Sequence, residues 1–230
     1  DISTESGNIS LSADNDISIL GLLSTTGGNI VLNADADASG TGTLTINDGV
    51  TIGTSGGDIT FEAADVALNN AADTITAGTG TINLYTSVAS RTMGIGGPDE
   101  DYDLSDAELA TIASVNKIVF GKLNTQAGDI FFQTVTSPVS TAEIEVNTTG
   151  SVELDDAGTA TALATGSGVI DINATSGITA ANATSSVAEL STTGQIQLDT
   201  SSSAAIGSST NRIELAGDQG EIIIGADGAS

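Results

Sequence analysis

The chain has 230 residues, 30 of them acidic and only 4 basic, which gives a formal net charge of −26. Such a charge excludes electrostatic attraction to nucleic acid and to anionic membrane surfaces. The lack of cysteine excludes disulfides and thiolate metal sites. No apolar run approaches the ~18–20 residues of a membrane-spanning helix, so we expect no membrane insertion.

The composition favours an all-β chain with many turns. Aromatic residues make up only 3%, and the 39% hydrophobic content comes mainly from isoleucine, valine, leucine and alanine. These residues stand among threonine, serine, asparagine and 28 glycines. β-Branched residues suit pleated strands, and glycine and asparagine suit tight turns.

A repeated unit, Gly-x-Φ-x-Φ with Φ apolar, runs along the whole chain. The two Φ positions are two residues apart, so both side chains point to one face of a strand, while the middle residue is usually polar and faces out. The units begin at Gly7, Gly28, Gly57, Gly80, Gly128, Gly150, Gly168, Gly194 and Gly220.

The spacing of these glycines predicts the coils of a solenoid. The intervals are 21, 29, 23, 48, 22, 18, 26 and 26 residues. Most intervals hold further short strands, and stacked coils would place isoleucine on isoleucine at roughly 4.8 Å per coil. The prediction is therefore an all-β, right-handed parallel β-helix (β-solenoid) of roughly eight or nine coils. Residues 1–230 would form a single solenoid fragment of a longer protein.

A β-sandwich is the rival fold, because it also has short alternating strands with frequent turns. It needs no internal repeat, however, and this chain has no tryptophan and no cysteine pair of the immunoglobulin type. The recurrence of one motif favours the solenoid.

The interval from Gly80 to Gly128 departs from the repeat, and we predict an insertion over about 94–116. Ser105 and Glu108 have capping-box spacing, and Asp106 suits the first turn of a helix. A short helix over about 105–113 is expected to lie against the solenoid.

Two stretches of this region carry a resemblance to a known family. They are Arg91-Thr92-Met93-Gly94-Ile95-Gly96-Gly97 and Leu104-Ser105-Asp106-Ala107-Glu108-Leu109. Followed by a strand ending in Gly121 and by Gly128-Asp129-Ile130, they resemble a module of filamentous-haemagglutinin-like giant exoproteins of the two-partner-secretion type. The resemblance implies a secreted or outer-surface bacterial protein that serves adhesion or cell–cell contact. It also implies further flanking repeats in the parent protein. The family's secretion domain is not among these residues.

Catalysis is not expected. Without histidine and cysteine, the common nucleophile–base pairs are unavailable. The enzymatic alternative is a polysaccharide-degrading β-helix, in which carboxylates on adjacent coils act together. Thirty acidic residues produce acidic pairs by chance, and few aromatic side chains are present to stack on sugars. Catalytic and cofactor-binding residues are therefore predicted to be none.

Calcium is the ligand that the acidic loops favour most, because it takes six to eight oxygen ligands. Asp99, Asp101 and Asp103 alternate beside a Gly-Gly-Pro turn, and Asp35 and Asp37 form a weaker candidate. The alternative interpretation is that both are solvated acidic loops.

The sequence thus predicts a non-catalytic structural or adhesive shaft. Its expected partners are another cell surface or a polysaccharide. The two alternatives are a polysaccharide-binding or polysaccharide-degrading β-helix and a calcium-organised surface module.

Overall fold

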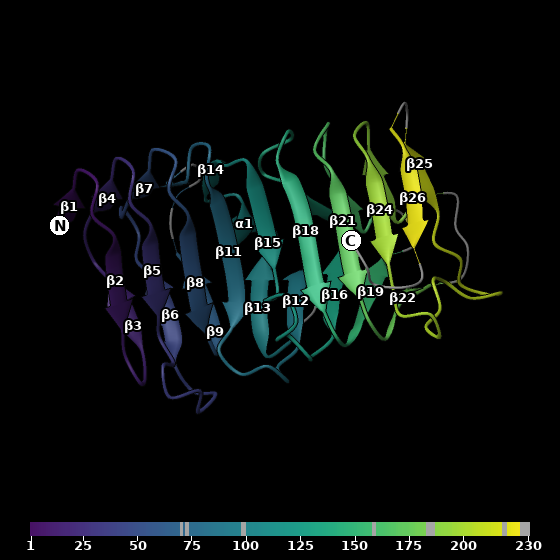
Figure 1. The fold of residues 1–230 in the computed structure, drawn as a ribbon, viewed down its shortest axis with the longest axis horizontal. Helices are drawn as coiled ribbons and strands as arrows, with labels where there is room; N and C mark the ends of the chain where they lie inside the picture. The colour runs from purple at the N-terminus through teal and green to yellow at the C-terminus, as the bar shows by residue number, and fades with distance from the viewer. Residues whose placement is uncertain are drawn as a thin grey trace.

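The computed structural model describes residues 1–69, 71, 74–97, 100–157, 160–182, 187–217 and 220–225. The chain winds into an all-parallel β-solenoid of about 8 turns, with its strands side by side along the longest axis (Figure 1). The prediction of an all-β parallel β-helix is confirmed.

One nine-stranded sheet, here called the long sheet, runs the full length of the solenoid. Its strands, in spatial order, are β2 (Ile9–Ser12), β5 (Ile30–Asn33), β8 (Ile59–Ala63), β11 (Thr81–Thr86), β15 (Lys117–Phe120), β18 (Glu143–Thr148), β21 (Ile170–Ala174), β24 (Ile196–Asp199) and β26 (Ile222–Gly225).

The other walls differ between the two halves of the chain. The N-terminal half is closed by two sheets: β1 (Ile2–Thr4), β4 (Leu23–Thr25), β7 (Ile52–Thr54), β10 (Ile75–Thr76) and β14 (Ile112–Ser114); and β3 (Ile17–Ile19), β6 (Thr43–Ile46) and β9 (Asp65–Leu68). The C-terminal half is closed by β13 (Tyr102–Ser105), β12 (Met93–Gly96), β16 (Ile130–Gln133), β19 (Ser151–Asp155) and β22 (Gly177–Ala180); and by β17 (Val135–Thr136), β20 (Leu163–Ala164), β23 (Leu190–Thr192) and β25 (Leu215–Gly217).

A column of isoleucines forms the spine of the core. Every strand of the long sheet contributes one: Ile9, Ile30, Ile59, Ile82, Ile118, Ile144, Ile170, Ile196 and Ile222. All of them except Ile222 are buried. The residue two positions after each isoleucine is also apolar and forms a second column. In that column the ring of Phe120 packs edge to face against the ring of Phe132, with the ring centroids 5.5 Å apart. Parallel register thus stacks like on like along the axis.

The isoleucine column also gives the true coil lengths. Successive isoleucines are 21, 29, 23 and 36 residues apart, and then 26 residues apart four times. The glycine spacing gave a different count because Gly128 and Gly150 precede strands of a side wall, β16 and β19. The long-sheet strands that they appeared to supply are β15 and β18, which have no glycine at that position. The repeat was identified correctly, and the structure shows that seven of its nine copies belong to the long sheet and two to a side wall.

The glycines of the repeat are required by close approach of successive coils. A Cβ added at Gly57 would lie 2.1 Å from the carbonyl oxygen of Gly28, and one at Gly28 would lie 2.2 Å from that of Gly7. Neither glycine has a positive φ. The small residue is therefore needed for space between stacked backbones, and the expected role as a flexible turn residue does not explain these positions.

Asparagine or aspartate often follows this glycine because its side chain caps the next coil. The Oδ1 of Asn8 accepts from the Asn29 N–H at 2.9 Å. Asn29 Oδ1 accepts in the same way from the Asp58 N–H at 2.9 Å, and Asp58 Oδ1 from the Thr81 N–H at 2.8 Å. A chain of side-chain bonds thus ties four coils together at this corner.

Buried threonines satisfy the backbone at the same corner. Thr25 Oγ1 donates to the Gly7 carbonyl at 3.2 Å and accepts from the Gly28 N–H at 2.9 Å. Thr148 and Thr192 make the equivalent pair of bonds in later coils. Each hydroxyl links one coil to the next, so polar groups at a buried corner have partners.

The predicted insertion forms part of the wall of the solenoid. The strand β13 pairs parallel to β12, on the side opposite β16. The helix α1 (Asp106–Leu109) then begins at Ser105 with the predicted capping box, in which the Ser105 side chain and Glu108 bond reciprocally. It ends four residues before the predicted end, because Ile112 enters β14 and pairs with Ile75. Glu108 Oε1 also accepts from the Leu68 N–H at 3.0 Å, which fixes the helix to β9.

Candidate functional site

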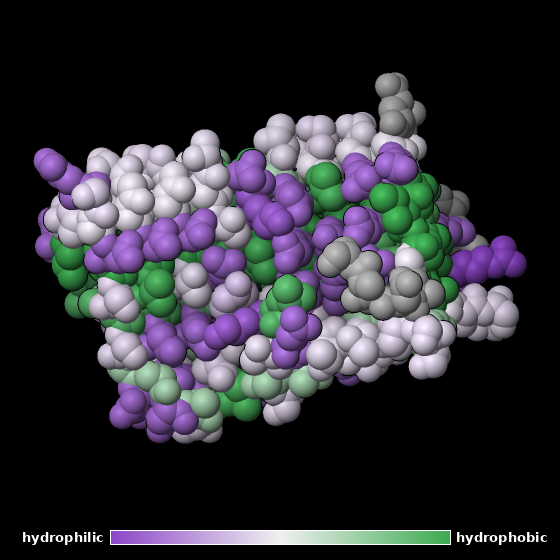
Figure 2. Space-filling model, viewed as in Figure 1, coloured by the Kyte–Doolittle hydropathy of each residue, from purple (hydrophilic) through white to green (hydrophobic). Residues whose placement is uncertain are grey.

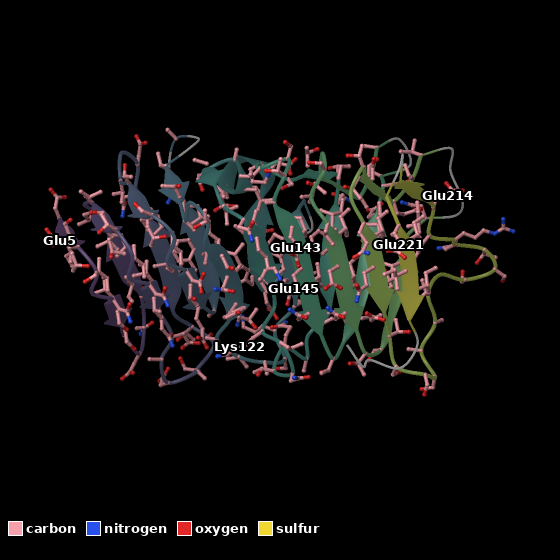
Figure 3. All side chains as sticks on the ribbon, turned by 45° about the horizontal axis from the view of Figure 1, so that its top comes forward. Glu5, Lys122, Glu143, Glu145, Glu214 and Glu221 are labelled. Carbon is pink, nitrogen blue, oxygen red and sulfur yellow. The ribbon has the colours of Figure 1, made fainter. Side chains whose placement is uncertain are left out.

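Polar side chains collect on the outer face of the long sheet where the coils are most regular. In β15, β18, β21 and β24 the inward positions are apolar, and the alternate residues face out. The outward residues include Lys117, Glu143, Glu145, Asn147, Asp171, Asn173, Gln197 and Asp199. Figure 3 shows Glu143 and Glu145 together on β18, near the middle of the rod. Register sets Glu145 directly beside Asp171 on the next coil.

Lys117 neutralises one end of this acidic group. Its Nζ lies 2.8 Å from Glu143 Oε1 and 2.7 Å from Glu145 Oε2. Burial alone would raise the pKa of Glu145, but the hydrogen bonds from Lys117 and Asn147 outweigh it and lower that pKa. Glu145 is therefore held as a carboxylate.

Asp171 is in the opposite situation. Burial, followed by repulsion from Glu145, Glu143 and Asp199, raises its pKa to about 6, and Lys117 offsets only part of the rise. Its Oδ1 accepts from Asn173 Nδ2 at 3.2 Å. Two neighbouring carboxyl groups thus have pKa values moved in opposite directions, a pattern found at functional sites and also in structural ion-pair networks.

These residues line a hollow of about 560 Å³ on the outer face of the sheet. Its floor comes from β18, β21 and β24 and the residues that follow them, and its rim includes Leu123 and Asn124. The lining residues are Leu123, Asn124, Glu145, Asn147, Thr148, Thr149, Asp171, Asn173, Ala174, Thr175, Asp199, Thr200 and Ser201. Hydrogen-bonding groups dominate, so the hollow is suited to a polar ligand.

Removing the charge of Asp171 should stabilise the protein. Because its pKa is higher in the folded state than the unfolded value of 3.8, stability falls as pH rises from about 4 to about 6. We expect Asp171→Asn to raise the free energy of unfolding at pH 7 by about 1 kcal/mol, after discounting for partial exposure. Urea unfolding at pH 7 and pH 3.5 measures this, and the gain should vanish at the lower pH.

Asp14→Asn is the matched control, because it removes the same formal charge from an exposed position far from the hollow. If both variants gain equally, the effect comes from net charge and the local repulsion at Asp171 is not its cause.

The predicted residue Asp35 is buried, and protein donors surround its carboxylate. Oδ1 accepts from the Ser39 N–H at 3.0 Å and from the Ser39 hydroxyl at 2.8 Å. Oδ2 accepts from the Gly40 N–H at 2.8 Å and from the Ser87 hydroxyl at 2.5 Å. Asp37 is exposed, and its Oδ1 accepts from the Ser39 N–H at 3.2 Å. The Asp35 carboxylate therefore organises its own loop and ties it to the chain at Ser87.

Arg91 joins this loop to the second predicted group. Its guanidinium donates to the carbonyl of Gly40 and to the carbonyl of Asp101, each at 2.9 Å. It also lies 3.9 Å from the Asp101 carboxylate. The Asp103 N–H donates to Asp65 Oδ1 at 3.1 Å. The two acidic loops, far apart in sequence, thus converge on one protein cation.

Calcium binding by these loops stays a prediction. Asp99 lies outside the described residues. Among the residues that the structure does describe, no three acidic side chains are arranged to hold a metal ion. A melting temperature raised several degrees by calcium, on chelator-treated protein, would support a site.

Asp35 should make stability sensitive to acid. Burial would raise its pKa, but hydrogen bonds from Ser87, Ser39 and Gly40 outweigh this and lower it from 3.8 to about 2. The stabilisation is therefore present above pH 4 and lost as pH falls toward 2. We expect Asp35→Asn to cost about 2 kcal/mol at pH 7 and almost nothing near pH 2, measured by chemical unfolding. The exposed Asp37→Asn is the control, and an equal loss there would contradict the assignment.

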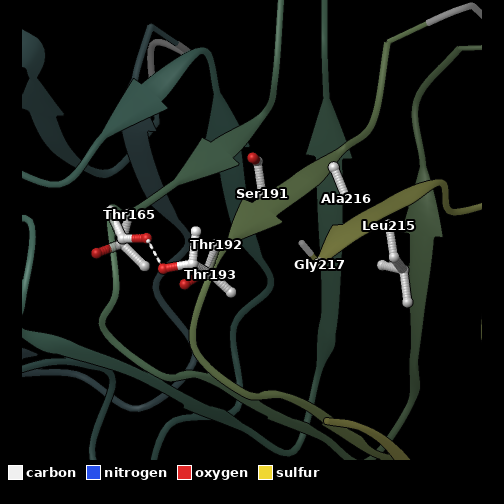
Figure 4. Close-up of a pocket in the computed structure, with 8 residues that line it drawn as sticks. Thr165, Ser191, Thr192, Thr193, Leu215, Ala216 and Gly217 are labelled. Carbon is white, nitrogen blue, oxygen red and sulfur yellow. Dashed lines mark hydrogen bonds between the residues drawn. The ribbon is translucent and has the colours of Figure 1, made fainter. Parts of the chain in front are cut away.

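A second, shallower hollow lies on the sheet of β17, β20, β23 and β25 (Figure 4). Its lining is made of small hydroxyl and apolar residues, among them Thr165, Ser191 and Leu215. The Thr165 N–H donates to the Ser191 carbonyl at 2.9 Å as part of the strand pairing. It offers no charged group, so the long-sheet hollow is the better candidate site.

The hollow was not predicted as a unit. The repeat pattern predicted only that Asp171 and Gln197 face outward, and it left Glu143 and Glu145 as one of many acidic pairs expected by chance. Aligning the chain on the 26-residue interval would have placed Glu145 over Asp171 and Asn147 over Asn173, and that is the signal that could have found it.

Comparison with known proteins gives no match to a family model, to a curated protein or to a solved structure. In the described ranges, no helix combines the length and the apolar character needed to span a bilayer.

Proposed function

We propose that this chain is a structural shaft segment of a large secreted or cell-surface bacterial protein that mediates adhesion or cell–cell contact. Its resemblance to filamentous-haemagglutinin-like exoproteins supports this assignment. The shaft itself is non-catalytic, and its outer faces are available to a partner surface.

The observation that carries the proposal is the unbroken isoleucine column through all nine strands of the long sheet. Each coil buries its apolar face only against its neighbours, so length is gained by adding coils without changing the core. Such an architecture separates two points in space by a distance set by the number of coils.

The surface also fits a shaft. Hydrophilic side chains cover much of the face seen in Figure 2, and apolar surface gathers near β26. Ile222, Ile223 and Ile224 of that strand are 45%, 37% and 61% exposed. In a longer shaft a neighbouring coil would stack on this strand and cover them, since an exposed strand edge is otherwise prone to association.

Surface location is tested with antibodies to the folded chain, applied to intact and lysed cells of the source bacterium. We expect labelling of intact cells, removed by external protease. Labelling only after lysis would overturn the proposal.

The shaft role is tested by varying the number of 26-residue coils in the natural protein. We expect adhesion or aggregation to change gradually with coil number. Complete loss on removing one particular coil, but not others, with the protein still folded and on the surface, would show that adhesion depends on a localised site and not on the length of the shaft.

A further inference from the structure

Leu123 is an unexplained apolar side chain in the middle of an acidic rod. It is 58% exposed. The other large apolar residues of comparable exposure among those described all lie on the end coils: Ile2, Leu20, Leu22, Ile222, Ile223 and Ile224. Of these exposed apolar residues, only Leu123 lines the long-sheet hollow. An apolar side chain beside polar groups suits a ligand that has both apolar and polar surface.

The loop that presents Leu123 is held firmly. The N–H groups of Thr125 and Gln126 both donate to the Lys122 carbonyl, at 3.0 and 2.9 Å. The Gln126 side chain is buried, donates to the Arg91 carbonyl at 2.7 Å and accepts from the Thr86 hydroxyl at 2.5 Å. Leu123 therefore projects from a fixed turn, and a ligand would not have to order it.

The floor of the hollow repeats from coil to coil. Asn147 and Asn173 lie side by side in register, and Asn173 Nδ2 lies 3.3 Å from Asn147 Oδ1. Asp199 continues the same outward column on β24. Coils are about 4.8 Å apart, so the floor offers a row of polar groups to an extended polymer that runs along the axis.

The balance of these groups selects the ligand class. Three carboxylates, from Glu145, Asp171 and Asp199, stand beside three side-chain amides, from Asn124, Asn147 and Asn173. Acceptors outnumber donors, so the ligand should bring many hydroxyl donors. The net charge of −26 opposes an anionic polymer. A peptide strand would seek free backbone groups at a sheet edge, whereas the strands under the hollow are paired on both sides.

We propose that this hollow binds a neutral, hydroxyl-rich polysaccharide, with the C–H face of a sugar ring on Leu123 and its hydroxyls on Asn173, Asp171 and Asp199. This goes beyond the shaft function: it gives the shaft a side-on contact to a glycan, and either proposal can stand without the other. Binding should be weak for one sugar chain and gain strength when many shafts lie side by side.

The test uses the whole chain, labelled with ¹⁵N, and neutral hexasaccharides of glucose, of N-acetylglucosamine and of mannose as probes. We expect at least one probe to shift the amide signals of Leu123, Asn147 and Asn173, without change between low salt and 0.5 M salt, because a neutral ligand is not screened. Leu123→Ser should weaken binding about fivefold or more, as for loss of an apolar contact of ~1 kcal/mol.

Leu20→Ser is the matched control, because Leu20 is 80% exposed on the first coil and does not line the hollow. It should leave binding unchanged, and both variants should keep the parent melting temperature. The proposal is overturned if no probe shifts these signals at millimolar concentration. It is equally overturned if calcium or oligolysine shifts them in a salt-sensitive way while the sugars do not, which would make the hollow an electrostatic site.

Discussion

Gly57→Ala should destabilise the solenoid by about 3 kcal/mol, an effect at the upper end of overpacking. The added Cβ would lie 2.1 Å from the Gly28 carbonyl oxygen, 2.6 Å from its carbonyl carbon and 3.0 Å from the Asn29 side chain. Two of these atoms are backbone and cannot rotate away. Relief requires the third coil to move off the second, which weakens the Asn29 bond to the Asp58 N–H. Urea unfolding followed by circular dichroism measures the loss.

Gly27→Ala is a closely matched control. Gly27 immediately precedes a repeat glycine, and an added Cβ there meets nothing within 4 Å. Substitution should be neutral or gain up to about 1 kcal/mol by restricting the unfolded chain. If Gly27→Ala lowers the free energy of unfolding as much as Gly57→Ala does, the repeat needs glycine for its backbone conformation, and close contact between stacked coils is not the reason.

The contrast between these glycines shows what the sequence can and cannot predict. Gly-x-Φ-x-Φ correctly indicated stacked short strands, because alternation and a tight approach both leave marks in residue type. The motif does not encode which wall a strand joins. Gly128 and Gly150 therefore looked identical to Gly57, although their strands belong to a side wall.

The 36-residue coil shows a second limit. The capping box at Ser105 and Glu108 is a local signal, and it located the start of α1 correctly. The end of the helix depends on pairing between Ile112 and Ile75, a contact set by the stacking of coils. Long-range pairing of this kind overrides local propensity.

The candidate site is the least predictable part for the same reason. Asp35 drew attention as an acidic residue in a run, but its four donors come partly from Ser87, a residue 52 positions away. Asp171 carried no special signal, yet burial, together with repulsion from Glu145, Glu143 and Asp199, raises its pKa to about 6. Residues that meet across coils are found from the register, and the register requires the fold.

Deleting one complete coil should leave a folded, shorter solenoid. Removing residues 145–170 takes out 26 residues and joins Ile144 to Asp171, so Ile144 takes the place of Ile170 in the core column. The deletion also removes the side-wall strand β19, which lies between β16 and β22. These two strands can then pair directly, because Ile130 of β16 and Ile178 of β22 both face Val152 of β19 in the same register. In the other side wall the deleted strand is β20. Its neighbours β17 and β23 both pair with Leu163 of β20, so they can pair with each other once it is removed.

We expect this variant to unfold cooperatively, with a urea m-value reduced by roughly a ninth, in proportion to the surface lost. Its length in solution scattering should fall by about 4.8 Å.

Deleting residues 145–169, one residue fewer, should have a far larger effect. Ile144 then precedes Ile170, and continuing the register of β15 would place Ile170 outward beside Val119 and Asp171 inward beside Phe120. A one-residue slip exchanges the two faces of the strand in which it occurs, and an unpaired carboxylate in an apolar core costs several kcal/mol. The coils after the junction should therefore lose fixed packing, seen as reduced β-sheet circular dichroism and a lower melting temperature. Equal stability of the two deletions would show that the isoleucine column does not set the register, because only the 26-residue deletion keeps every isoleucine in line.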